Sequence, residues 1–484
     1  MNNMESLDRK RSHTKSSQRN KRQKVHERYI EREELAMPLI GSVADDLTGA
    51  TTTGVLLARS KARTAVFFNV EAATKAEGLD ELDAIIISSN SRPLPADEAY
   101  AKVKDATIAL KRMNVKYFQK RIDTTMRGGI GVEIDAMLDQ LSEDTIAVVV
   151  PAMPQSKRIL VGGYSVIDGT ALINTPVAQD VRTPVKENYI PKLLASQTRR
   201  KVGFVSLDKV LSGEEAICAG LQEEKEAGCR VIVVDAITLE DVEHIAQACI
   251  TLKWDIVSVD PGPFTSKLAY YRNIIGKEEP NLPPQGNENG KTVLIAAGSA
   301  TPVTKKQMEV LCQDPRHIRV SVDPLALIEG GEDALLEVDK AITRAAELMD
   351  QDIPPRAILF ETALHGELLN LEEEDAKRGY ADGMSANRIN AGLGTIIQLV
   401  LGRSGKERIA GIYTTGGDTM VNVCYQLGVE CIEVVDYVIP QTDIGRLIGS
   451  PYSGLPIVGK GGLTGNDTIA CEIVTRLFDE RARK

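Results

Sequence analysis

Short apolar runs rich in β-branched residues alternate with longer segments of helical periodicity from residue 39 onward. The runs that predict strands lie at 39–44, 64–68, 84–88, 146–150, 202–207, 230–235, 256–260, 293–297, 318–322, 357–361, 409–415 and 456–458. The segments that predict helices include 97–113, 213–227, 239–249, 332–349 and 385–401. Continuously apolar strands separated by helices are typical of parallel sheets that helices cover on both faces. The pattern therefore predicts an α/β protein.

One segment interrupts this alternation. Residues 276–291 contain three prolines, three glycines and three acidic residues, a composition typical of a linker. We therefore expect two α/β domains with mostly parallel sheets, at 37–278 and 292–484, joined by a linker at 279–291. We expect the active-site cleft to lie between them.

Charge is unevenly distributed along the chain. Residues 1–36 contain ten Lys/Arg and six Asp/Glu, a net charge of +4, whereas the whole chain carries −10. The segment also has few apolar residues, which cannot form a core. We therefore expect it to be a disordered basic extension. Its alternatives are a nucleic-acid-binding arm or a targeting signal. The favoured interpretation is an extension upstream of a start at Met37.

Composition narrows the function further. No window approaches eighteen consecutive apolar residues, so no membrane partner is expected. One Trp and 4% aromatic residues argue against nucleic acid as a partner. Seven scattered cysteines without a C-x-x-C pair indicate reduced thiols and a cytoplasmic location.

Two polar motifs of the first domain follow predicted strands, and a third follows residues 115–118. The first is ADDLTGA (44–50), in which Asp45 and Asp46 exceed what a helix N-cap requires. The second is NSR (90–92), whose arginine can bind a carboxylate with two hydrogen bonds or simply lie on a surface turn. The third is KRIDTTMRGG (120–129), which combines cations, an acid and hydroxyls, or else forms a solvated strand edge. Together they indicate a site for an anionic polyol at the carboxyl ends of the strands.

Three glycine-rich turns follow strands of the second domain. They are GSATP (298–302), TGGDT (415–419) and GKGG (459–462). Such turns let backbone N–H groups approach phosphates, so that three in one domain predict a nucleotide site. GNENGKT (286–292) is one residue short of a P-loop and precedes a strand, so we exclude it.

In their order and spacing over 37–480, these motifs resemble the four-carbon acid sugar kinase family, whose members phosphorylate threonate, erythronate or 3-oxo-tetronate with ATP. The resemblance implies a sugar-acid-binding first domain and a nucleotide-binding second domain. It implies that the sugar acid contacts Asp46, Arg92, Lys120, Asp123, Thr124, Thr125 and Arg127. It implies that ATP contacts Ser299, Gly416, Gly417, Asp418, Thr419, Lys460, Gly461 and Gly462.

For the reaction, we expect phosphorylation of the terminal 4-hydroxyl of D-threonate or D-erythronate. Asp46 or Asp45 would orient and deprotonate the hydroxyl, and Arg92 with Lys120 would hold the carboxylate. Mg²⁺ is the expected metal, with Asp418 as its protein ligand. The run Arg121-Ile122-Asp123 departs from the 3-oxo-tetronate branch, which disfavours that alternative. A non-catalytic sensor of sugar acid and nucleotide is the rival function. Whether the chain forms a homodimer stays open.

Overall fold

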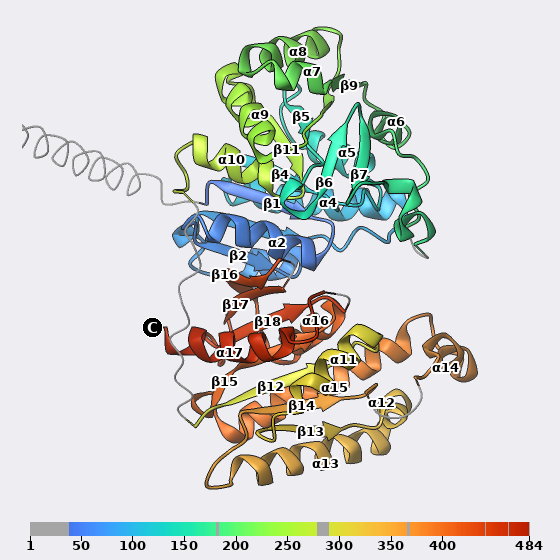
Figure 1. The fold of residues 1–484 in the computed structure, drawn as a ribbon, viewed down its shortest axis with the longest axis vertical. Helices are drawn as coiled ribbons and strands as arrows, with labels where there is room; N and C mark the ends of the chain where they lie inside the picture. Colours follow the sequence, from blue (N-terminus) through green and yellow to red (C-terminus); the bar gives the residue numbers. More distant parts are fainter. Residues whose placement is uncertain are drawn as a thin grey trace, which may run out of the picture.

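The computed structural model describes residues 38–180, 183–277, 290–364, 368–440, 442–462 and 464–483. These residues form two α/β units, one above the other along the long axis of the molecule (Figure 1). The expected extension at 1–36 and most of the expected linker at 279–291 lie outside the described residues. No helix of the described part is long and apolar enough to cross a membrane.

The first unit is a parallel sheet with helices on both faces (Figure 1). In spatial order, its strands are β2 (Thr64–Phe67), β3 (Ala84–Ser88), β1 (Ile40–Ala44), β4 (Tyr117–Arg121), β11 (Ile256–Asp260), β5 (Ile146–Val149), β10 (Val231–Val234) and β9 (Val202–Val205). Its helices are α2 (Leu47–Ala58), α3 (Val70–Lys75), α4 (Ala96–Arg112), α5 (Ile130–Leu138), α6 (Ile190–Ala195), α7 (Leu207–Leu211), α8 (Glu214–Glu226), α9 (Leu239–Leu252) and α10 (Pro263–Tyr271). A small antiparallel sheet comprises β6 (Arg158–Val161), β7 (Tyr164–Ile167) and β8 (Thr170–Ala171).

The second unit combines parallel strands with an antiparallel hairpin. In spatial order, its strands are β13 (His317–Ser321), β14 (Ala357–Glu361), β12 (Thr292–Ala297), β15 (Ile409–Thr415), β18 (Pro456–Lys460), β17 (Thr442–Ile448) and β16 (Cys431–Ile439). Its helices are α11 (Pro302–Leu311), α12 (Pro324–Glu329), α13 (Gly331–Met349), α14 (Leu371–Arg378), α15 (Met384–Ser404), α16 (Gly417–Gln426) and α17 (Ile469–Ala482).

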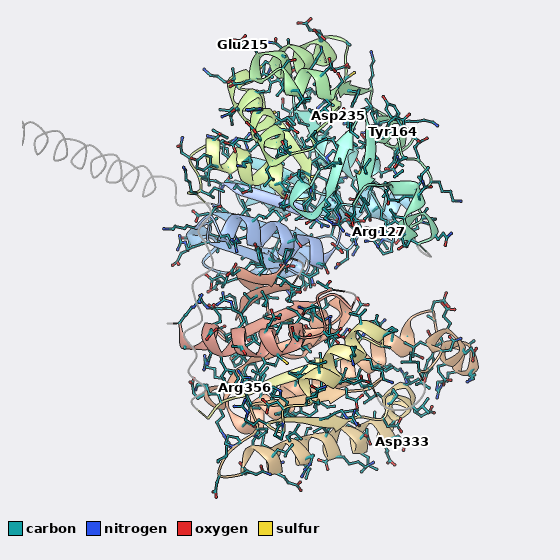
Figure 2. All side chains as sticks on the ribbon, in the orientation of Figure 1. Arg127, Tyr164, Glu215, Asp235, Asp333 and Arg356 are labelled. Carbon is teal, nitrogen blue, oxygen red and sulfur yellow. The ribbon has the colours of Figure 1, made fainter. Side chains whose placement is uncertain are left out.

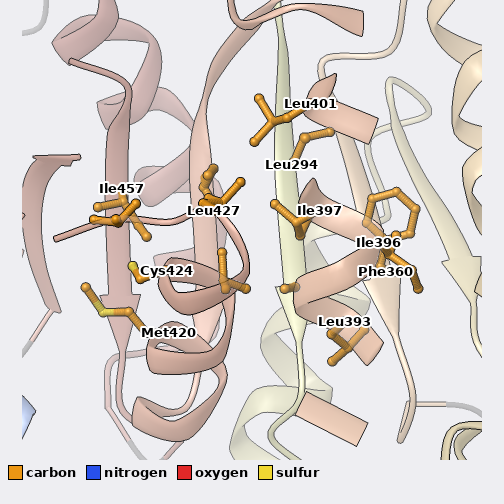
Figure 3. Close-up of a cluster of buried hydrophobic side chains, with 14 of the residues drawn as sticks. Leu294, Phe360, Leu393, Ile396, Ile397, Leu401, Met420, Cys424, Leu427 and Ile457 are labelled. Atoms are coloured by element: carbon orange, nitrogen blue, oxygen red, sulfur yellow. The ribbon is translucent and has the colours of Figure 1, made fainter. Parts of the chain in front are cut away.

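Burial explains why these segments form these elements. Every residue of β1, β3, β11, β14 and β15 is buried, as the uninterrupted apolar runs require of strands covered on both faces. Helix α13 instead buries one stripe, which includes Val338, Ala341, Ala345 and Leu348, at helical spacing. Side chains of α15 and α16 pack together on one face of the second sheet (Figure 3).

The two sheets are joined edge to edge. Strand β16 pairs antiparallel with β2, from Cys431 opposite Phe67 to Val434 opposite Thr64, so that all described strands except β6, β7 and β8 form one sheet of 15. Beside this pairing, Arg59, which directly follows α2, forms a 3.0 Å salt bridge with Asp436 of β16. The fold thus confirms two mostly parallel α/β units. In addition, the strands of the two units belong to one continuous sheet. The apolar pattern did not predict the β16–β17 hairpin that makes this junction.

Candidate active site

The three adjacent strands β3, β1 and β4 bring acids and arginines together where they end. Asp45 and Asp46 follow β1, Arg92 lies in the loop after β3, and Arg121 is the last residue of β4. Arg92 contacts Asp45 and Asp46 at 2.7 Å each, through Nε and Nη1. Arg121 Nη1 contacts the same two carboxylates at 3.0 and 3.1 Å. Sequence reasoning expected Asp46 and Arg92 to share this site and missed Arg121.

The local structure explains these positions. Asp46 is the N-cap of α2, and its Oδ1 accepts a hydrogen bond of 2.8 Å from Gly49 N–H. A methyl group on Gly49 would lie 1.7 Å from Arg121 Nη1, so the guanidinium packs directly on the glycine. Burial alone would raise the pKa of Asp45, but the charges of Arg92 and Arg121 outweigh it and lower that pKa. Both expected catalytic acids are therefore held by two arginines, and their role as a base stays a prediction.

Lys120 points to the opposite side of β4 from Arg121, as successive strand residues do. Its side chain is fully buried, and Nζ lies 2.7 Å from Glu133 of α5. The other oxygen of Glu133 accepts a 2.6 Å hydrogen bond from Ser91. The expectation that Lys120 contacts the ligand carboxylate does not fit this arrangement, because no part of the side chain reaches the surface. Glu133, a partner that sequence reasoning missed, thus connects the loop after β3, through Ser91, with the end of β4, through Lys120.

The loop after β4 adds a second ion pair. Arg127 Nε lies 2.7 Å from Asp123, and its Nη1 lies 3.2 Å from Asp180. Burial would raise the pKa of Asp123, but Arg92 and Arg127 reverse this and lower it. Thr125 donates a hydrogen bond to Asp123, and Thr124 is buried beside it. Arg127 lies at the border of the first unit that is nearer the second (Figure 2). These residues and the Asp45–Arg92 pairs form one polar cluster, because Arg92 also acts electrostatically on Asp123.

In the second unit, the ends of adjacent strands β12, β15 and β18 carry the glycine-rich turns. Ser299 N–H donates to Thr415 Oγ1 at 3.2 Å, and Gly416 N–H donates to the Lys460 carbonyl at 2.8 Å. Thr301 donates to the Gly462 carbonyl at 2.6 Å. The structure thus brings all three expected turns together, with Gly417, Asp418 and Thr419 in the first turn of α16 and Gly461 after β18.

Small residues are required in these turns. Gly416 has φ = 98°, a conformation that suits glycine, and a methyl group on Gly462 would lie 2.7 Å from Ser299 Oγ. Thr419 donates to Asn390 of α15 at 2.7 Å, a residue that sequence reasoning missed. Backbone N–H groups at the start of α16 favour anions, as a helix N-terminus does. The three turns therefore form a surface suited to phosphates.

Lys460 is the buried cation of this region. Its Nζ donates to the Gly461 carbonyl at 2.7 Å, and it has no carboxylate within salt-bridge distance among the described residues. Burial lowers the pKa of Lys460 to about 8. A buried ammonium with only carbonyl partners gains most from an incoming anion.

A small pocket lies where the two units meet. Thr48 and Thr51 of α2 line it from the first unit, and Gly416, Gly417 and Lys460 line it from the second. A methyl group on Gly417 would lie 3.6 Å from Thr48 Oγ1, so the starts of α2 and α16 almost touch. Asp443 of β17 also lines the pocket, and no motif in the sequence had indicated it.

The described residues offer few side chains that could bind magnesium. No group of three or more His, Cys, Asp or Glu side chains suited to a metal occurs in the described part of the chain. Asp418 is exposed in the first turn of α16, beside the phosphate-binding surface. Since Mg²⁺ keeps several waters and binds phosphates with one or two carboxylates, a single acid at this position fits it.

Comparisons with known proteins agree with this division of the chain. Family models described as a sugar-binding N-terminal domain and a nucleotide-binding C-terminal domain match residues 40–268 and 294–470. A D-erythronate kinase of Heliobacterium modesticaldum is 39% identical over 90% of this chain and 96% of its own length. A D-threonate kinase of Salmonella typhimurium is 27% identical over 89% and 96%.

A solved structure supports the fold. A Haemophilus influenzae protein, 22% identical, superimposes with a TM-score of 0.70 over 90% of this chain and 100% of its own. The two matched domains and the 39% identical relative show that the chain belongs to the four-carbon acid sugar kinase family, a family of phosphotransferases.

Proposed function

We propose that the protein transfers the terminal phosphoryl group of ATP to the 4-hydroxyl of a four-carbon sugar acid, with D-erythronate as the preferred substrate. One observation carries the proposal. The pocket at the junction is lined by the start of α2, directly after Asp45 and Asp46 of the acid–arginine cluster, and by the glycine-rich turns after β15 and β18. Phosphoryl transfer requires an acceptor and a phosphate held in line, and this pocket adjoins both sets of groups.

The polar cluster supplies the groups that a sugar acid needs. Arg92 is 14% exposed and Arg127 29%, so each can exchange part of its contact with Asp45 or Asp123 for a substrate carboxylate. Asp46, 29% exposed, can accept a hydrogen bond from a substrate hydroxyl. Asp123, Thr124 and Thr125 would bind the remaining hydroxyls. Lys120 acts as a positioning residue that fixes Glu133 and the loops around it.

The phosphate-binding turns would hold the nucleotide. Ser299, Gly416, Gly417 and Thr419 would donate hydrogen bonds to its phosphates, and Lys460 with the Gly461–Gly462 turn would balance their charge. Asp418 would hold Mg²⁺, which supplies charge neutralisation of the phosphates when it is bound. A closed pocket between the two units would keep water from the transferred group.

Substrate preference rests on two supports. Arg121-Ile122-Asp123 differs from the run of the 3-oxo-tetronate branch, which favours an aldonate. The 39% identical relative is a D-erythronate kinase, which favours erythronate over threonate. The test is ADP release by the purified protein with D-erythronate, D-threonate and 3-oxo-tetronate. If the protein binds nucleotide but releases no ADP in the presence of any of these acids, the result would instead support a sensor.

A further inference from the structure

We propose that Asp443 is the general base that removes the proton of the substrate hydroxyl. The inference rests on the proposed function and adds a catalytic residue to it. Asp443 lies on β17, in the hairpin that joins the two sheets, and its side chain lines the same pocket as Thr48 and Gly417. It is therefore the carboxylate that faces the space between the polar cluster and the phosphate-binding turns.

The position of Asp443 follows from strand pairing. It lies opposite Gly459 of β18, whose missing side chain lets Met420 of α16 pack against the strand beside Asp443. On the other side, Thr51 of α2 lies near the Asp443 carboxylate and acts to lower its pKa, and the Thr51 hydroxyl donates to the Thr48 carbonyl at 3.0 Å. Asp443 is 8% exposed and forms no ion pair with any cation of the described residues. A carboxylate in this state has lone pairs available for a substrate proton.

The surroundings of Asp443 favour the protonated form. Burial raises the pKa of Asp443 to about 7, and the charge of Asp436 on β16 adds to the rise. The Thr51 hydroxyl and the Arg121 guanidinium, from α2 and β4, act in the opposite direction and lower it. Lys460 of β18 is the other charged residue that lines the pocket. A base is most effective when its pKa lies near the working pH, and Asp443 meets this condition.

Asp45 and Asp46 are less suited to the same role. Both are held by Arg92 and Arg121, and Asp46 also accepts the N-cap hydrogen bond from Gly49. For Asp45, the charges of Arg92 and Arg121 lower the pKa, which weakens its affinity for a proton. For Asp46, the lone pairs are already engaged by these contacts. Their chemistry suits orientation of the sugar acid, which leaves proton removal to Asp443.

The proposed step balances as follows. The O–H bond of the 4-hydroxyl breaks, and its proton passes to the Asp443 carboxylate. The hydroxyl oxygen forms a bond to the γ-phosphorus of ATP, and the bond from that phosphorus to the bridging oxygen breaks. ADP leaves with the bond electrons, and Asp443 later releases its proton to water. No oxidant or additional reactant is required.

The experiment compares the pH dependence of kcat/KM for the sugar acid at saturating MgATP in wild type and three variants. In the wild type, kcat/KM should rise with pH up to about 7 and then level off. Asp443→Asn keeps the shape of the side chain and should lower kcat by about 10²–10⁴-fold and remove this rise. Because the γ-phosphate of ATP titrates in the same range, the comparison between variants at identical nucleotide isolates the enzyme group.

Thr51→Val gives an independent test that does not require Asp443→Asn to fold. It removes a hydroxyl that favours the charged form of Asp443, so the rise in kcat/KM should move to higher pH. Asp350→Asn removes an exposed carboxylate at the C-terminal end of α13, in the second unit, and serves as the matched control, with the wild-type profile expected.

Three results would overturn the proposal: Asp443→Asn with nearly wild-type kcat, Asp443→Asn with an unchanged rise in kcat/KM, or Thr51→Val with an unshifted profile. Loss of MgATP binding by Asp443→Asn, measured by calorimetry, would also contradict it and make Asp443 a nucleotide-binding residue. Failure of the proposed function is distinguishable, because the wild-type protein itself would then release no ADP with four-carbon acids.

Discussion

The substitution Gly49→Ala tests how the acid–arginine cluster is built. The new methyl group would lie 1.7 Å from Arg121 Nη1, so the guanidinium must leave its place on α2. Its contacts with Asp45 and Asp46, at 3.0 and 3.1 Å, would be lost. Breaking a buried ion pair costs about 3–5 kcal/mol, and alanine regains up to about 1 kcal/mol in a helix. We therefore expect a net loss of about 2–4 kcal/mol in the free energy of unfolding.

Binding should change selectively in this variant. Sugar-acid affinity should fall, because Asp45 and Asp46 lose one of their two arginines, whereas ATP affinity should stay near wild type. Urea denaturation and calorimetric titration of each ligand measure these effects. Gly402→Ala in α15 is the control, since its methyl group would lie 3.7 Å from Tyr452 Oη and should stabilise the helix slightly. If Gly49→Ala is as stable as Gly402→Ala and binds the acid normally, the described packing of Arg121 is wrong.

Three further predictions follow. Arg92→Ala should weaken sugar-acid binding by about 1.5–3 kcal/mol and spare ATP, whereas Gly416→Val, which strains a turn at φ = 98°, should weaken ATP and spare the acid. Calorimetry that finds the reverse pattern would refute the division of roles. Lys460→Met should raise the KM for MgATP, because it removes the buried cation from the phosphate-binding turns. Kinetics with an unchanged KM would exclude that role. Asp443 titrates at about 7 in the folded protein and at 3.8 when unperturbed, so its contribution to stability is lost as pH rises through 7. Relative to wild type, the free energy of unfolding of Asp443→Asn should therefore rise between pH 5 and pH 8, by about 3 kcal/mol. An equal difference at both pH values in urea denaturation would contradict this sign.

Local pattern was sufficient to predict β1 and β3, but it did not predict β4, which carries Lys120 and Arg121. Fully buried parallel strands appear as uninterrupted apolar runs, and the polar residue that follows such a run must lie at the carboxyl end of the sheet. This is why Asp46 after β1 and Arg92 after β3 could be expected to meet. The turns at Ser299 and Gly416 were predictable for the same reason, since β12 and β15 are neighbours.

Side-chain direction and long-range pairing were not predictable in the same way. Lys120 and Arg121 are adjacent cations, and the motif alone does not say which one faces the ligand and which one faces Glu133. Asp443 lies in a strand without a motif, and its place in the pocket depends on the pairing of β16 with β2 across hundreds of residues. Such contacts depend on tertiary structure, which propensity and periodicity do not encode.

The most direct test of the central claim is the site of phosphorylation on the sugar acid. The purified protein is incubated with MgATP and D-erythronate, ADP release is followed, and the product is analysed by phosphorus and carbon NMR. We predict ADP release with a higher kcat/KM for D-erythronate than for D-threonate, and phosphate bonded to the oxygen of C4. Phosphate on C2 or C3, or no ADP release with any four-carbon acid, would contradict the assignment of this pocket to phosphoryl transfer.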